Sequence, residues 1–185
     1  MHSLLELFAE PMLDQHTVLD RAQTWPETAR EKELEALRSQ LLAPSDANSR
    51  QETIRSAQIA VAWLPITKHV IIEALSSNSA EIKFACLCAM SDLSASAILD
   101  CGTELILHIW KSAAENSDDP DETVAYMAAT VLSRLPDSTL NIVITDELLE
   151  CASSYFIGLL QDLLHQQNKL VPLLLAEVKK SDEDH

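Results

Sequence analysis

Three pairs of acidic residues and histidines are spaced so that both side chains of a pair share one face of a helix. The pairs are His69 and Glu73, Glu104 and His108, and Asp162 and His165. Each pair could supply two ligands to a metal ion, but a zinc site needs three or four. No second motif completes any of them. We therefore expect no metal and no cofactor, and we interpret each pair as a carboxylate–imidazole contact on a helix surface.

Other catalytic motifs are missing from the sequence. The chain contains only two glycines, Gly102 and Gly158, and the clustered glycines of a phosphate-binding loop or a dinucleotide fold are therefore absent. There is no Gly-x-Ser-x-Gly elbow to present a nucleophilic serine. We expect a protein that is not an enzyme and that has no small-molecule ligand. A helical metalloenzyme is the alternative, which metal analysis would test.

The four cysteines do not form a disulfide framework. Cys86 and Cys88 are two residues apart on a predicted helix, so their side chains diverge by roughly 200° and cannot easily share a metal or a disulfide. Cys86 falls on an apolar helix face, and we interpret it as a small core residue. This pattern favours a reducing compartment, the cytoplasm, since neither a signal peptide nor a membrane span is evident.

Nearly all segments of the chain have helical rather than alternating hydrophobic periodicity. The scarcity of glycine also disfavours a β-rich fold, so we expect an all-α protein. The run 140–144 could be a strand, but we predict a short helix because no other strand is available to pair with it. Thr145 or Asp146 is expected to cap a long helix that continues to about Leu164. We divide the chain into an N-terminal helical cap (1–43), repeated helices (49–150), a C-terminal helical cap (151–180) and a polar tail (181–185).

One apolar template recurs along the chain. Counting from Ile82, apolar residues follow at positions +3, +4, +7, +8 and +11, and the same template holds in full from Val124. A third, partial copy starts at Ile54. Acidic residues stand just before each copy, and a second apolar helix follows it. The copies are spaced 28 and 42 residues apart, so the repeat is irregular.

Two of these segments, 80–85 and 119–124, resemble the first helix of a HEAT repeat, in which an acid precedes Val or Ile and Ala-rich positions. The resemblance covers roughly residues 49–150. It implies a HEAT-like α-solenoid of about three helix pairs with helical caps, in which each pair buries its apolar face against its neighbours. The alternative is an irregular helical bundle. The resemblance also implies that the second helix of each pair lines a concave binding surface.

The chain is strongly acidic, and the charge is unevenly distributed. The formal net charge is -16. Residues 84–168 contain 13 acids and only two cations, Lys111 and Arg134, a local balance of -11. Nucleic acids and anionic membranes would be repelled, whereas a basic protein would be attracted. An acidity that serves only solubility is the alternative.

These observations predict a protein-binding module with an acidic surface. We expect it to be an immunity or inhibitor protein that neutralises a basic toxin or nuclease domain. The alternative is a HEAT-type adaptor or assembly factor in a multi-protein complex. Trp110 borders the acidic half and could contact the partner, although core packing is the alternative. The residues expected to contact the partner are Glu104, His108, Trp110, Lys111, Glu115, Asp118, Asp119, Asp121, Glu122, Asp146, Glu147 and Glu150.

Overall fold

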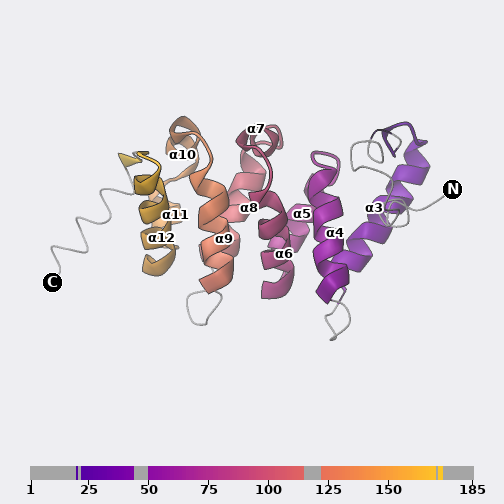
Figure 1. The fold of residues 1–185 in the computed structure, drawn as a ribbon, viewed down its shortest axis with the longest axis horizontal. Coiled ribbons are helices and arrows are strands. Elements are labelled where there is room, and N and C mark those ends of the chain that lie inside the picture. Colours follow the sequence, from indigo (N-terminus) through magenta and orange to yellow (C-terminus); the bar gives the residue numbers. More distant parts are fainter. Residues whose placement is uncertain (1–19, 21, 44–49, 115–121, 170, 173–185) are drawn as a thin grey trace. The chain divides into compact units, whose positions relative to one another are not determined.

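The computed structural model describes residues 20, 22–43, 50–114, 122–169 and 171–172 (Figure 1). These residues form ten α-helices and no strand, which confirms the all-α class. Two compact units divide the chain after Ala89, inside the segment predicted to contain the repeats. The first unit contains α3 (Glu27–Leu41), α4 (Arg50–Ala62), α5 (Lys68–Leu75) and most of α6 (Ala80–Ser91). The second unit contains α7 (Ala95–Leu99), α8 (Thr103–Ala114), α9 (Glu122–Ser133), α10 (Asp137–Val143), α11 (Asp146–Glu150) and α12 (Ser154–Gln166).

In the first unit, α4 packs against both α3 and α5, and α3 also contacts α5. Trp63 follows α4 directly and is buried. The hydroxyl of Thr67 donates a hydrogen bond to the carbonyl oxygen of Ala60, so the start of α5 is tied back to the last turn of α4. This bond also satisfies a hydroxyl that is itself buried.

The buried face of α4 differs from the predicted one by one residue. Ile54, the predicted start of the template, is 38% exposed, whereas Thr53 and Ser56 are buried. The register that starts at Thr53 continues through Ala57, Ala60 and Val61, which are also buried. The prediction was wrong because it took the most apolar residue as the anchor. All residues along one side of a helix together decide whether that side is buried, and here two small polar residues belong to the buried side.

The templates of α6 and α9 are confirmed in part as buried faces, because Ala89, Leu93 and Met127 are only partly buried. In α6 the buried template residues are Ile82, Ala85, Cys86 and Met90. In α9 and the turn after it they are Val124, Ala128, Val131, Leu132 and Leu135. The hydroxyl of Ser79 accepts a hydrogen bond of 3.4 Å from the backbone N–H of Ile82, so Ser79 caps the start of α6.

The second unit is built around α9. Both α8 and α12 pack against α9, and α8 also contacts α7 and α10. Within this unit, Figure 1 shows α12 beside α9, with α8 behind α9. Trp110 of α8 and Phe156 of α12 meet in the core as an edge-to-face pair, with ring centroids 5.0 Å apart and planes at 77°. Such a pair stabilises beyond its buried area.

Two predictions for the region after α9 have different outcomes. The run 140–144 lies mostly in helix α10, so the prediction of a short helix is confirmed. The predicted long helix from Thr145 to Leu164 is wrong, because α11 ends at Glu150 and α12 starts anew at Ser154. Ser153 causes the restart, since its hydroxyl accepts a hydrogen bond of 3.2 Å from the N–H of Phe156.

Candidate partner-binding surface

Helix α8 presents three of the predicted contact residues along one face. Glu104, His108 and Lys111 are spaced four and three residues apart, so they share one side of the helix. Glu104 and Lys111 are exposed and His108 is partly exposed. Gly102, with φ of 84°, forms the turn just before α8, a conformation that favours glycine. Glu104 lies in the first turn and Lys111 in the last, where each charge interacts favourably with the helix dipole.

Trp110 lies away from this face of α8 and does not belong to this surface. Its side chain is only 1% exposed. Its indole N–H donates a hydrogen bond of 3.3 Å to the carbonyl oxygen of Leu148 in α11. The interpretation of Trp110 as a partner contact is therefore wrong, and the alternative, core packing, holds. The six-residue offset from Glu104 places the indole about 120° from the exposed face.

Helix α11 presents the second group of predicted contacts. The hydroxyl of Thr145 accepts a hydrogen bond of 3.4 Å from the N–H of Leu148 and caps the helix. Buried Leu149 anchors the helix to the unit. Leu148 is partly buried, and the three acidic side chains, Asp146, Glu147 and Glu150, are exposed. Within the described part of the chain these three carboxylates form no ion pair, so they are open to solvent or to a partner.

The Trp110 hydrogen bond makes α8 and α11 neighbours in the second unit. Both helices carry exposed acids, Glu104 on α8 and the trio Asp146, Glu147 and Glu150 on α11. This partly buried hydrogen bond joins two residues, Trp110 and Leu148, that are 38 apart in the chain. We call the exposed residues Glu104, Asp146, Glu147 and Glu150 the acidic set, in which Glu104 lies about 120° around α8 from the indole that contacts α11.

The other predicted contacts are placed only in part. Glu122 is the first residue of α9, and its side chain lies outside the described residues. Glu115, Asp118, Asp119 and Asp121 also lie outside the described residues. The acidic turn that these residues were predicted to form therefore stays a prediction.

The histidine–carboxylate pairs give no metal site in the residues that the structure describes. No group of three or more potential ligands occurs there. Glu73 instead accepts two hydrogen bonds from Arg38, and this contact lowers its pKa. Asp162 and His165 are both exposed on α12. The side chain that was predicted to be a small core residue, Cys86, is fully buried, and this burial raises the pKa of its thiol to about 12.

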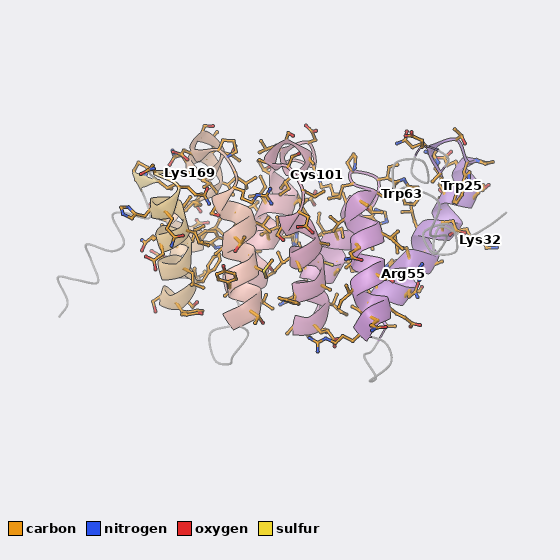
Figure 2. All side chains as sticks on the ribbon, in the orientation of Figure 1. Trp25, Lys32, Arg55, Trp63, Cys101 and Lys169 are labelled. Carbon is orange, nitrogen blue, oxygen red and sulfur yellow. The ribbon has the colours of Figure 1, made fainter. Side chains whose placement is uncertain are left out.

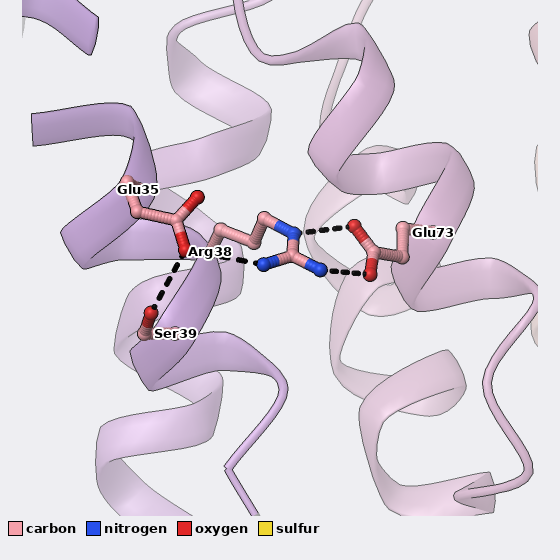
Figure 3. Close-up of polar contacts among 4 residues, drawn as sticks. All are labelled: Glu35, Arg38, Ser39 and Glu73. Carbon is pink, nitrogen blue, oxygen red and sulfur yellow. Dashed lines mark hydrogen bonds and ion pairs between the residues drawn. The ribbon is translucent and has the colours of Figure 1, made fainter. Parts of the chain in front are cut away.

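Besides the Trp110 hydrogen bond, two further long-range polar contacts were not predicted. Arg38 of α3 binds Glu73 of α5, 35 residues away (Figure 3). Lys169, labelled in Figure 2, donates hydrogen bonds to the carbonyl oxygens of Ser133 and Leu135 at 2.5 and 2.9 Å. It thereby caps the C-terminal end of α9 from the residues that follow α12. The sequence contains only one signal for these contacts. Cations are scarce in it, so each Lys or Arg is a notable residue.

Comparison with known protein families, curated proteins and solved structures gave no match for this chain. Among the described residues, no helix combines the length and the apolar character needed to cross a membrane.

Proposed function

We propose that this protein is a non-enzymatic binding module that takes a cationic protein partner on the acidic set of α8 and α11. The observation that carries the proposal is the exposure of Asp146, Glu147 and Glu150 without a described ion pair on a helix that Trp110 fastens to α8. Three unneutralised carboxylates within five residues produce a negative potential that speeds encounter with a basic surface.

The proposal includes the arrangement of the helices as a HEAT-like α-solenoid. Support comes from the buried apolar residues of the α6 and α9 templates and from the order of helices: α6 is followed by the short helix α7 and then α8, and α9 by the short helices α10 and α11 and then α12. Proteins of that type bind partners along an extended surface. None of the four cysteines, all of which the structure describes, forms a disulfide, and this fits the proposed cytoplasmic location.

The form of this function that we favour is an immunity or inhibitor protein. A basic toxin or nuclease domain uses cationic residues to bind phosphates, and a group of carboxylates can bind the same cationic residues. A pull-down from the source cells that includes the products of neighbouring genes tests this form. We expect a partner of high isoelectric point. Recovery of only neutral or acidic partners would contradict it.

A second candidate function is an adaptor in a multi-protein complex. The observation that favours it is a pair of half-exposed tyrosines on the adjoining helices α9 and α12, Tyr126 at 49% and Tyr155 at 47% exposure. Tyrosine is enriched in protein interfaces because it combines a large ring with a hydrogen-bonding group. An adaptor would co-purify with several subunits, and its binding would depend only weakly on salt.

Binding of a decalysine peptide, measured by isothermal titration calorimetry, tests the cationic preference. We expect affinity at low salt that falls steeply as salt increases, because the charges involved are exposed. Lys111→Gln should tighten binding, since it removes the cation that shares a face of α8 with Glu104. Lys32→Gln, which removes an exposed cation from α3 in the other unit, is the matched control and should have a smaller effect. Absence of binding, or binding that does not respond to salt, would contradict the proposal.

A further inference from the structure

Helix α3 is attached to the first unit by few buried side chains. Of its 15 residues only Leu37 and Leu41 are buried, and both lie in the last five. By contrast, α4 buries six of its 13 residues and α5 four of its eight. The apolar contribution that fastens α3 is therefore concentrated at its C-terminal end.

An ion pair acts at the same end of α3. The guanidinium of Arg38 donates from Nε and Nη2 to the two carboxylate oxygens of Glu73, at 2.6 and 2.5 Å (Figure 3). Its Nη1 donates to Glu35 one turn earlier, at 3.2 Å. Arg38 stands between the two buried leucines in the sequence, so the ion pair and the apolar contacts fasten the same turn to the unit.

This ion pair is accessible to solvent and to salt. The side chains of Arg38 and Glu73 are 38% and 43% exposed. Exposed pairs are weakened by dissolved ions, because the screening length falls from about 10 Å at 0.1 M to about 3 Å at 1 M. The fork geometry makes the pair stronger than an ordinary surface contact without removing this sensitivity.

The first part of α3 is less buried than its last turn, since its side chains are at most partly buried. Pro26 occupies the N-cap position, and no side chain caps the helix there. None of the residues from Glu27 to Ala36 is buried. An isolated helix of this length is marginal in water, so α3 would lose its structure once its last turn was released.

The remainder of the first unit also has buried contacts that do not include α3. Helices α4 and α5 contact one another directly. Their fully buried residues include Ala57, Ala60, Val70, Ile71 and Ala74. The hydrogen bond from Thr67 to the carbonyl oxygen of Ala60 joins the two helices without α3.

We propose that α3 is a releasable flap, which detaches from α4 and α5 as one segment while those helices stay folded, and that salt promotes the release. The Arg38–Glu73 pair is the latch. Release frees the carboxylate of Glu73 together with the part of the unit that Leu37 and Leu41 cover. The local opening needs only a small fraction of the free energy of global unfolding, as is usual for segments with few buried contacts.

Hydrogen exchange of the full chain, followed by mass spectrometry, tests the proposal. In the wild type we expect the amides of α3 to exchange faster than those of α4 and α5, and faster still at about 1 M than at about 0.1 M NaCl. Arg38→Gln should accelerate exchange in α3 by about two- to fivefold at low salt, leave α4 and α5 unchanged, and abolish the salt effect on α3.

Arg50→Gln is the matched control. It removes a cation from a different exposed pair, Arg50 with Glu81 at 3.5 Å, which does not include α3. It should leave exchange in α3 unchanged. Equal exchange rates in α3, α4 and α5 would overturn the proposal, because the three helices would then open together. An exchange rate of α3 that does not change with salt would overturn the role of the Arg38–Glu73 pair as the latch. An equal change of that rate in both variants would overturn it as well. Exchange of the wild type at the two salt concentrations needs no variant. It therefore tests whether salt promotes the release of α3 even if Arg38→Gln unfolds the unit.

Discussion

At the scale of single residues, the electrostatics of Arg38 and Glu73 depend on their mutual contact. The hydrogen bond from Arg38 is the largest cause of the lowered pKa of Glu73, and a smaller contribution comes from the charge of His69. The same contact raises the pKa of Arg38. Glu73 therefore prefers the ionised form more strongly in the folded protein than in the unfolded chain.

This preference predicts an acid-sensitive contribution to stability. Because the folded pKa of Glu73 lies below its ordinary value of 4.5, the contribution is present above pH 4.5 and is lost as the pH falls through the folded pKa. Urea unfolding at a series of acidic pH values should show the wild type losing more stability than Glu73→Gln. Identical pH dependence in the two proteins would contradict the pairing.

Cys86 and Cys88 provide a second prediction at this scale. Cys86 is fully buried and its pKa is raised by burial to about 12, whereas Cys88 is exposed. A thiol that stays protonated does not react as a nucleophile. Thiol labelling of the native protein, located by peptide mass spectrometry, should therefore modify Cys88 and leave Cys86 unmodified until urea is added. Equal labelling of both residues before unfolding would show that the buried face of α6 is wrongly assigned.

At the scale of helices, Trp110 holds α8, α11 and α12 together. It packs on Phe156 and donates to the carbonyl oxygen of Leu148. Trp110→Ala should lower the free energy of unfolding by about 3–5 kcal/mol. Trp110→Phe, which keeps a ring but removes the N–H, should lower it by about 1–3 kcal/mol. Urea denaturation measures both, with the partly exposed Trp25 as the control site. A Trp25→Ala variant that lost as much stability would contradict the central position of Trp110.

Lys169 contacts the end of α9 directly, although the two are far apart in the sequence. Its ammonium group donates to the carbonyl oxygens of Ser133 and Leu135, and Gln167 donates to the hydroxyl of Ser133 at 3.1 Å. Lys169→Met keeps most of the aliphatic chain but removes the donor to these oxygens. It should cost about 1–3 kcal/mol in urea denaturation. Lys111→Met, at an exposed position on α8, is the control and should cost much less.

The elements that the sequence predicted well are those with a complete apolar stripe. Val124 and Ile82 start faces that are mostly buried, because every template position carries an apolar or small side chain. Ile54 misled the prediction, since burial of Thr53 and Ser56 depends on what packs against α4 and not on their own hydrophobicity. The restart at Ser153 was missed for a different reason, since serine favours a helix start over a helix interior and the prediction did not use this signal.

The candidate surface was predicted in part. Exposure of Glu104, Asp146, Glu147 and Glu150 agrees with the expectation, because charged residues are rarely buried without a partner. The hydrogen bond between α8 and α11 could not be predicted, since it joins residues 38 apart in the chain. Periodicity describes each helix alone and contains no information about which helix will lie beside it.

At the scale of the whole molecule, the central question is whether net charge or its location binds a cationic partner. The formal net charge of -16 attracts any polycation to some degree. Location matters more if the acidic set forms the binding surface. The two possibilities differ in what happens when the same number of charges is removed from different places.

Two triple variants separate these possibilities most directly. Asp146→Asn, Glu147→Gln and Glu150→Gln together remove three charges from α11. The other variant removes three exposed charges from α3 and α4 in the first unit, and it combines Glu27→Gln, Glu31→Gln and Glu52→Gln. Calorimetric titration with decalysine at low salt should show that the α11 variant binds about five- to tenfold more weakly than the wild type. The matched variant should bind within about twofold of the wild type. Equal weakening in both would contradict the account, because binding would then follow net charge alone.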